Sequence, residues 1–369
     1  MKEVSKAAIA AKKKLTSNFF KKGISLALFS GLTYGMYTSF LTMGMTKGVW
    51  GDWYGANTAG LSAFVLAYLV AALGNAINDS ISAVWAILYA VIKGKFGDFL
   101  RCINTKPGRV MILAALIGGP VAGTAYVIAL QMAGSIVVPI SALCPAIAAI
   151  LGKILFKQKL DKRMAFGILV CVFASFLIGS TSFSNGAAST KTFVGFGIAV
   201  IAALAWGFEG CVAGYGTAMI DYEIGIAIRQ VTSGIANLFI VVPVLGIMSG
   251  KAGVSFSLAA QAFASGPAMG WFILSGLLSV ITFMTWYAGN SMCGAGLGTA
   301  CNGTYSFFGP LFCLLLLGVY GGMDGWSLPS VAWVGAVIMM FGILTISMNP
   351  LDLFRRKNDD MGGSMNEAA

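Results

Sequence analysis

A single glutamate stands in one of the most apolar stretches of this sequence. The run "ALAWGFEGCVAGYG", residues 203–216, surrounds Glu209 with small and apolar side chains, and no Lys or Arg lies within ten residues of it. A charged side chain in hydrocarbon costs about 3 kcal/mol even on lenient scales, so such a residue faces the bundle interior or a wet cavity. Glu209 could pair with a cationic substrate, carry a proton that drives transport, or bind polar backbone. The alternative is a protonated, hydrogen-bonded structural acid.

Aromatic residues recur at helical spacing around this acid. Trp206 and Glu209 are three residues apart and share a helix face. Residues 31–39, "GLTYGMYTS", align with residues 203–211, "ALAWGFEGC", so that Tyr34 matches Trp206. Ring faces together with one carboxylate suit an organic cation, whereas a purely aromatic stripe is ordinary packing. The candidate substrate-binding residues are Tyr34, Tyr37, Trp206, Glu209, Trp286, Tyr287 and Tyr305.

A second acid with polar neighbours occurs in the segment "GNAINDS". Asp79 shares a helix face with Asn75, and Asn75 shares one with Asn78. This patch could hold a coupling cation through its oxygen atoms, or it could mark the cytoplasmic end of a membrane span. The candidates for a coupling ion or proton are therefore Glu209, Asp79, Asn75 and Asn78.

One basic residue lies inside an apolar stretch. Arg229 is near the cytoplasmic end of the predicted span 223–248. Its side chain could extend to the membrane surface, as long basic side chains do. Alternatively, it neutralises an acid such as Asp221 or Glu209.

Composition identifies the class of protein that must position these residues. Hydrophobic residues make up 58% and charged residues 10% of the chain, and the mean hydropathy is +0.85. Because soluble domains carry about 25% charged residues, this is an integral membrane protein. The chain has no histidine and no recognisable nucleophile–base pair, so we expect no enzyme activity, no cofactor and no metal site. The net charge of +11 sits in short segments between apolar spans, which disfavours nucleic acid as a partner.

Apolar runs predict an all-α integral membrane protein with ten transmembrane helices. Their approximate ranges are 24–46, 58–92, 110–131, 134–156, 164–181, 193–216, 223–248, 268–289, 294–320 and 330–348. This count puts 20 Lys and Arg residues on one side of the membrane and three on the other. The positive-inside rule then places both termini in the cytoplasm.

The two halves of the chain resemble each other. Besides the match described above, "TAYVIALQMAGS" in the first half corresponds to "MTWYAGNSMCGAG" in the second. Each half has five predicted spans, an odd number, so the second half is inverted relative to the first, as in many secondary transporters. We predict a basic cytoplasmic segment 1–22, a first repeat 23–182, a second repeat 192–349 and a cytoplasmic tail 350–369.

The sequence resembles the drug/metabolite transporter superfamily, EamA type, over most of residues 22–348. The most specific part is "YVIALQMAGSIVVPISALCPAIAAILGKILFKQKLDKRMAFGILVCVFASFLIG", residues 126–179. The chain departs from the family pattern at Gln158, where an acid is frequent, and in having Pro310 rather than a proline that matches Pro145. The resemblance implies ten helices in two inverted repeats and a central cavity lined mainly by helices 1, 3, 4, 6, 8 and 9.

These observations together predict a secondary transporter of the cytoplasmic (inner) membrane that moves a small organic solute by alternating access. The favoured substrate is an organic cation or amine, with Glu209 as its counter-ion. The alternative is a proton-coupled transporter of a neutral or zwitterionic metabolite such as an amino acid or nucleoside, with Glu209 as the proton carrier. A channel or receptor without coupled transport is a different class. The expected partners are the solute and the lipid bilayer, and a homodimer is left open.

Overall fold

The computed structural model describes residues 6–55, 60–157, 161–184, 189–217, 219–293 and 295–347, and within these ranges it is helical with no strand. The predicted tail 350–369 and residues 1–5 of the predicted basic segment lie outside the described residues. The protein is therefore an all-α membrane protein, as the composition indicates.

The helices of the first half begin with one long helix and continue through shorter pieces. They are α1 (Lys6–Gly44), α2 (Val49–Tyr54), α3 (Ala71–Ile92), α4 (Phe96–Ile103), α5 (Lys106–Leu116), α6 (Thr124–Ala133), α7 (Val137–Ser141), α8 (Cys144–Phe156) and α9 (Lys162–Ser184). Two π-helical segments, η1 (Val65–Val70) and η2 (Ile117–Gly123), and the 3₁₀ turn η3 (Gly134–Ile136) connect them.

The second half of the chain also consists of long helices and shorter helical segments. They are α10 (Thr190–Thr217), α11 (Tyr222–Ala236), α12 (Val242–Met248), α13 (Ala252–Ala264), α14 (Gly266–Cys293), α15 (Ala295–Asn302), α16 (Tyr305–Cys313) and α17 (Ser330–Ser347). The π-helical segments η4 (Asn237–Val241) and η5 (Leu314–Tyr320) continue α11 and α16.

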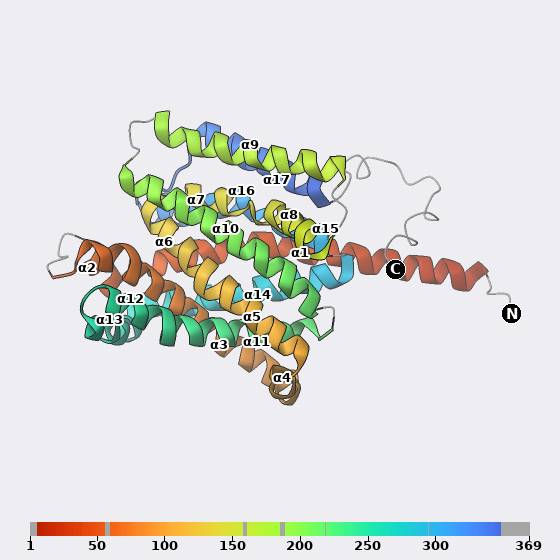
Figure 1. The fold of residues 1–369 in the computed structure, drawn as a ribbon, viewed down its shortest axis with the longest axis horizontal. Helices are drawn as coiled ribbons and strands as arrows, with labels where there is room; N and C mark the ends of the chain where they lie inside the picture. Colours follow the sequence, from red (N-terminus) through yellow and green to blue (C-terminus); the bar gives the residue numbers. More distant parts are fainter. Residues whose placement is uncertain are drawn as a thin grey trace.

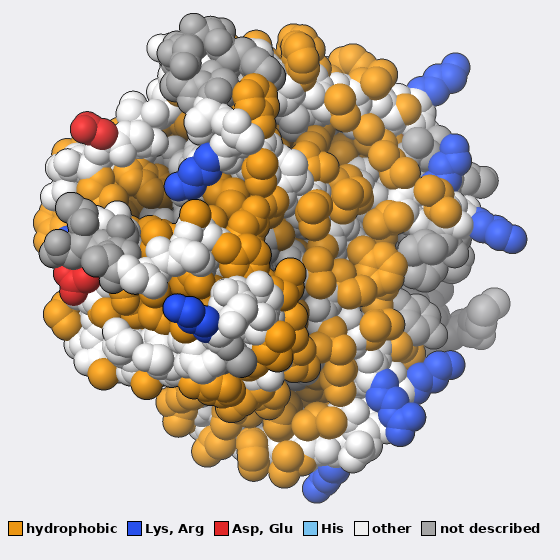
Figure 2. All heavy atoms as spheres, turned by 60° about the vertical axis from the view of Figure 1, so that its left-hand side comes forward, with side chains coloured by type: hydrophobic (Ala, Val, Ile, Leu, Met, Phe, Trp, Pro, Cys, Tyr) orange, Lys and Arg blue, Asp and Glu red, His pale blue; other side chains and the backbone are white. Residues whose placement is uncertain are grey.

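Within the described residues, each predicted span falls mostly on helical segments, with turns at residues 142–143 in the span 134–156 and at residues 303–304 in the span 294–320. Six helical stretches are long and apolar enough to cross a membrane: Asn18–Gly44, Val65–Ile92, Lys106–Ser141, Thr190–Ala213, Tyr222–Met248 and Gly266–Cys293. The stretch Lys106–Ser141 bends at Gly134, whose φ of 69° is a left-handed conformation that favours glycine. Figure 2 shows hydrophobic side chains over most of the visible face, as expected for a lipid-facing surface.

Three short helices and one extension are not among the predicted spans. The short helices are α2, α4 and α13. In α4, Phe99 is buried while Asp98 and Arg101 are exposed, so this helix lies along the end of the bundle. The N-terminal part of α1, from Lys6, continues the first span as one helix that projects beyond the other helices (Figure 1).

Helices of the two halves interleave rather than forming two separate bundles. Helix α1 packs against α14 and α16, α3 packs against α11 and α14, and α10 packs against α6 and α8. Helices α9 and α17 pair at one side of the molecule, at the top of Figure 1. Glycines allow this closeness, since a Cβ added at Gly35 of α1 would lie 2.7 Å from the Phe308 backbone of α16.

The connections between helices lie at the two ends of the bundle, and a different set of connections meets at each end. At one end the turn after α3 meets the start of α11, where Lys95 Nζ lies 2.7 Å from Asp221 and 2.5 Å from Glu223. Hydrogen bonds from Lys95 to these acids raise the pKa of its ammonium group. At the other end, Val49 N donates to Ser265 Oγ at 3.2 Å. Connections that the span count assigns to one side of the membrane thus meet each other in the structure.

Candidate functional site

Glu209 lies in a buried ion pair with Arg229. Arg229 Nε donates to Glu209 Oε1 at 2.6 Å, and Arg229 Nη2 donates to Oε2 at 3.3 Å. The two residues come from neighbouring helices, α10 and α11, and are 1% and 2% exposed. This two-pronged geometry matches the planar fork of a guanidinium to a carboxylate. Of the two acids that the sequence left open as partners of Arg229, the structure selects Glu209.

The rest of the guanidinium is also held by the protein. Its Nη1 donates to Gln230 Oε1 at 2.7 Å, and its central carbon lies 3.7 Å from the ring centre of Phe283 on α14. The Gln230 amide donates in turn to Ser82 Oγ on α3 and to Ser279 Oγ on α14 at 3.3 Å. Cation–π contact and shared hydrogen bonds offset the desolvation of Arg229. The pair therefore ties four helices together at the core.

Two consecutive glycines allow the helices to approach this closely. A Cβ added at Gly118 would overlap the Glu209 carboxylate, and one added at Gly119 would overlap Ser233 Oγ. Both glycines lie in the π-helical segment η2, which contains Pro120. Proline removes a backbone donor and π-helical geometry shifts the bonding pattern, so carbonyl groups become free to accept side-chain donors. Trp206 Nε1 uses one of them, donating to Gly118 O at 3.1 Å.

Aromatic residues from four helices form a cluster beside the ion pair. The Tyr34 ring stacks on Tyr305 with centres 4.2 Å apart and meets Tyr37 edge-on at 4.8 Å. Trp206 lies 6.1 Å from Tyr34 and 5.1 Å from Tyr126. The structure thus brings together Tyr34, Tyr37, Trp206 and Tyr305, which the sequence assigned to one site.

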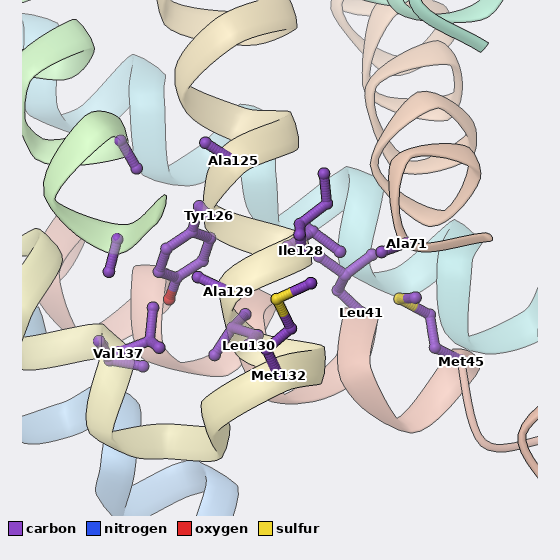
Figure 3. Close-up of a cluster of buried hydrophobic side chains, with 14 of the residues drawn as sticks. Leu41, Met45, Ala71, Ala125, Tyr126, Ile128, Ala129, Leu130, Met132 and Val137 are labelled. Atoms are coloured by element: carbon purple, nitrogen blue, oxygen red, sulfur yellow. The ribbon is translucent and has the colours of Figure 1, made fainter. Parts of the chain in front are cut away.

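This aromatic cluster continues into an apolar layer around α6. Tyr126 OH and Thr38 Oγ1 are 3.1 Å apart, which joins α6 to α1. Figure 3 shows the side chains of α6 between Val137 on one side and Leu41 and Met45 on the other. The Tyr34 hydroxyl is buried and interacts with the side chain of Tyr37 on the same helix.

The two remaining aromatic candidates lie elsewhere. Trp286 and Tyr287 of α14 pack in a second hydrophobic cluster with Phe283, on the side of the ion pair that leads to α4 and α5. Trp286 Nε1 donates to Thr299 Oγ1 at 3.3 Å. The hydroxyl of Tyr287 is buried with no hydrogen-bond partner among the described residues. The predicted seven-residue site is thus distributed over two aromatic groups, with Glu209 and Arg229 between them.

Asp79 belongs to the interior of the bundle rather than to a helix end. It lies near the middle of the helical stretch Val65–Ile92 and is 6% exposed. Ser233 Oγ donates to its Oδ2, and Asn237 Nδ2 donates to the same oxygen at 2.8 Å. Asn75 Nδ2 donates to Thr124 Oγ1 at 3.4 Å, next to this group.

Asn78 connects Asp79 to helices on the opposite side of α3. Its Oδ1 accepts a hydrogen bond from Ser275 Oγ of α14 at 2.7 Å, and the same hydroxyl lies 3.1 Å from Tyr37 O. Asn78 therefore connects α3 to α14 and α1. Of the polar patch that the sequence singled out, Asn75 lies beside the Asp79 group, and Asn78 hydrogen-bonds Asp79 as well as Ser275.

The sequence does not single out several other residues of this core, although they lie in predicted spans. They are Gly118, Thr124, Tyr126, Ser233 and Asn237. One signal was available: Arg229, Ser233 and Asn237 are spaced by four residues, so they form a polar stripe on one face of an otherwise apolar helix.

Comparison with known proteins supports the fold alone. No family model and no curated protein matches the chain. One solved structure, described only as the crystal structure of a protein, is similar with a TM-score of 0.52 and 19% sequence identity. The match covers 90% of this chain and 99% of that one. The helical arrangement is therefore shared over nearly the whole length of both chains.

The ion pair makes a prediction about stability. Changing either Glu209→Gln or Arg229→Gln alone leaves a charge buried without its partner, which costs about 3–5 kcal/mol of unfolding free energy. Changing both removes both charges, and the two amides can hydrogen-bond each other, so we expect most of the loss to be recovered. Thermal unfolding of the purified protein in detergent measures all three variants. Arg109→Gln, at an exposed position of α5, is the control and should change little. A double variant as unstable as the sum of the single variants would contradict the pairing.

Proposed function

We propose that this protein is a secondary transporter that moves a small organic solute across the cytoplasmic membrane by alternating access. In this proposal it has ten transmembrane helices arranged as two inverted five-helix repeats, like the drug/metabolite transporters of EamA type that its sequence resembles. The observation that carries the proposal is the Glu209–Arg229 pair, buried in an apolar bundle beside an aromatic cluster. Ionisable residues at such depth are expensive and are usually functional.

Helix packing supports the repeat. An inverted repeat relates spans 1 to 5 to spans 6 to 10, so α1 corresponds to α10, α6 to α14, and α8 to α16. The contact of α1 with α14 then maps onto that of α10 with α6, and the contact of α1 with α16 maps onto that of α10 with α8. The pairs α3–α11 and α9–α17 map onto themselves. A pseudo-two-fold axis would relate contacts in this way.

The buried arginine bears on the choice of substrate. An organic cation that takes Glu209 as its counter-ion must displace Arg229, and this would leave a guanidinium buried and unpaired at a cost of about 3–5 kcal/mol. A zwitterion that exchanges with the pair can satisfy both residues, with its anionic group on Arg229 and its cationic group on Glu209. A neutral solute can bind the aromatic groups and leave the pair intact. The ion pair therefore favours a zwitterionic or neutral metabolite over a simple cation.

A channel or a receptor is the competing class. A transporter that alternates between two closed states exchanges labelled solute inside vesicles for unlabelled solute outside, whereas a channel dissipates the gradient without such exchange. Counterflow in proteoliposomes, with choline, amino acids and nucleosides as probes, separates these classes. The proposal requires saturable exchange of at least one probe.

The charge asymmetry makes a prediction about orientation. In a variant without the seven native cysteines, a single cysteine at Lys251 should react with a membrane-impermeant maleimide in intact cells. A single cysteine at Lys106 should react only after the cells are permeabilised, because its segment is expected in the cytoplasm. Labelling at Lys106 in intact cells would contradict the span count.

The Glu209–Arg229 pair also makes a prediction about transport. If the wild type exchanges an amino acid, whose two charged groups would contact the pair, the double variant Glu209→Gln with Arg229→Gln should fold but lose counterflow of that amino acid. The reason is that losing a desolvated charge contact to a ligand costs about 2–5 kcal/mol. Initial rates of counterflow measure the effect.

A matched control distinguishes charge from disturbance of the fold. The double variant Asp98→Asn with Arg101→Gln removes an exposed ion pair of α4 and should exchange the probe at the wild-type rate. If the buried double variant folds and also exchanges at the wild-type rate, the pair is purely structural and the proposed role of Glu209 is wrong.

A further inference from the structure

The buried charges of the core do not sum to zero. Among the described residues, the charged side chains in the interior are Asp79, Glu209 and Arg229. Glu209 and Arg229 neutralise each other through their ion pair. Asp79 is in none of the ion pairs of the described residues, although it is 6% exposed. Arg229 acts on Asp79 without forming an ion pair with it, so an ionised Asp79 leaves these buried groups with a net charge of −1, which a bound cation would cancel.

The surroundings of Asp79 are rich in oxygen atoms from three parts of the fold. Ser233 Oγ and Asn237 Nδ2 contact the carboxylate, and Asn237 Oδ1 accepts from Thr124 Oγ1 at 3.1 Å. The hydroxyl of Thr124 is also the acceptor for Asn75. Hydroxyl, amide and carboxylate oxygens are the ligands that hard cations prefer. A Ser or Thr hydroxyl can donate a hydrogen bond to the ionised Asp79 carboxylate. After rotation, its oxygen can accept a hydrogen bond from the protonated carboxyl group or coordinate a metal cation.

Irregular backbone flanks the same place on two sides. Asn237 is the first residue of η4, and Thr124 directly follows η2. Short π-helical segments inside longer helices occur frequently at functional sites, because they leave backbone carbonyls without their usual helical partners. A Cβ added at Gly123, the last residue of η2, would lie 3.1 Å from Asn75 Oδ1. The backbone of η2 therefore borders this polar group directly.

We propose that Asp79, with Ser233, Asn237 and Thr124, is a site for a small monovalent cation, either a proton or Na⁺. Binding neutralises the buried charge that has no ion-pair partner among the described residues, so the net charge of the described interior alternates between −1 and zero. This site is distinct from the Glu209–Arg229 pair, which is already neutral. The role of the bound cation as a coupling ion rests on the proposed transport function, whereas its binding does not.

The titratable and charged groups that face Asp79 come from three helices. Arg229 of α11 and Glu209 of α10 interact with it electrostatically, as does Tyr37 of α1. The start of α6, the π segment η4 and the facing part of α14 contribute only uncharged side chains, such as Thr124, Asn237 and Ser275. Opening of the Glu209–Arg229 pair by a solute would change the field at Asp79, which provides a physical route for coupling the two sites.

Cation binding can be measured without knowing the solute. The full-length protein in detergent is melted between about pH 5 and pH 9 in NaCl, KCl or N-methylglucamine chloride at equal ionic strength. If the ligand is Na⁺, the melting temperature rises with Na⁺ and not with K⁺. If it is a proton, the folded state binds it more tightly than the unfolded state does, so stability rises as the pH falls and Na⁺ has no effect. In either case Asp79→Asn should lose the response.

Two further variants test the assignment to this site. Ser233→Ala keeps the carboxylate but removes a hydroxyl that donates to it. A Na⁺ response should therefore require more Na⁺, whereas a proton response should move to higher pH, because the ionised carboxylate loses a hydrogen-bond donor. Asp324→Asn, at an exposed acid, should respond like the wild type. A wild type that responds to neither cation, or an Asp79→Asn protein that responds like the wild type, overturns the inference. If the protein exchanges solute but does not respond to cations, the cation site is wrong and the proposed transport function is supported. If it responds to cations through Asp79 but exchanges no solute, the cation site is supported and the transport function is wrong.

Discussion

Hydrocarbon does not solvate charge, so the guanidinium of Arg229 and the carboxylate of Glu209 must solvate each other, and the arrangement of the core depends on that contact. The pair fixes α10 against α11 at 2.6 Å between Nε and Oε1. It requires Gly118, since a side chain there would occupy the position of the carboxylate. Gln230 and Phe283 then hold the remaining faces of the guanidinium and bring in α3 and α14. One contact thus determines how closely four helices can pack.

The same contact suggests how solute binding could be linked to helix movement in the proposed transport cycle. Glu209 and Trp206 are less than one turn apart on α10, so the ion pair and the aromatic cluster are attached to the same helix. Movement of α10 relative to α11 must either carry the pair along or break it. Breaking it is unfavourable unless a solute replaces both partners. Under the proposal, binding of the solute therefore reduces the cost of the movement, which is what alternating access requires of a substrate.

The sequence predicts helix positions well because an apolar run long enough to cross a bilayer has few other ways to satisfy its backbone. It also predicts the meeting of Tyr34 and Trp206, since the proposed repeat would place them at equivalent positions. It does not predict the partner of Arg229, because Asp221 and Glu209 were both within reach of a long side chain. The separation of Trp286 from Tyr34 depends on the rotation of α14 about its axis. That rotation is set by packing partners far away in the sequence.

Infrared spectroscopy of the Glu209 carboxyl group tests most directly whether this residue is ionised and paired with Arg229. The protein is prepared with ¹³C-labelled glutamate, and its spectrum is compared with that of the Glu209→Gln variant prepared in the same way. We predict that the difference shows the loss of an ionised-carboxylate band and no loss in the region of protonated carboxyl groups. Loss of a protonated carboxyl band instead would contradict the ion pair and return Glu209 to the role of a neutral structural acid.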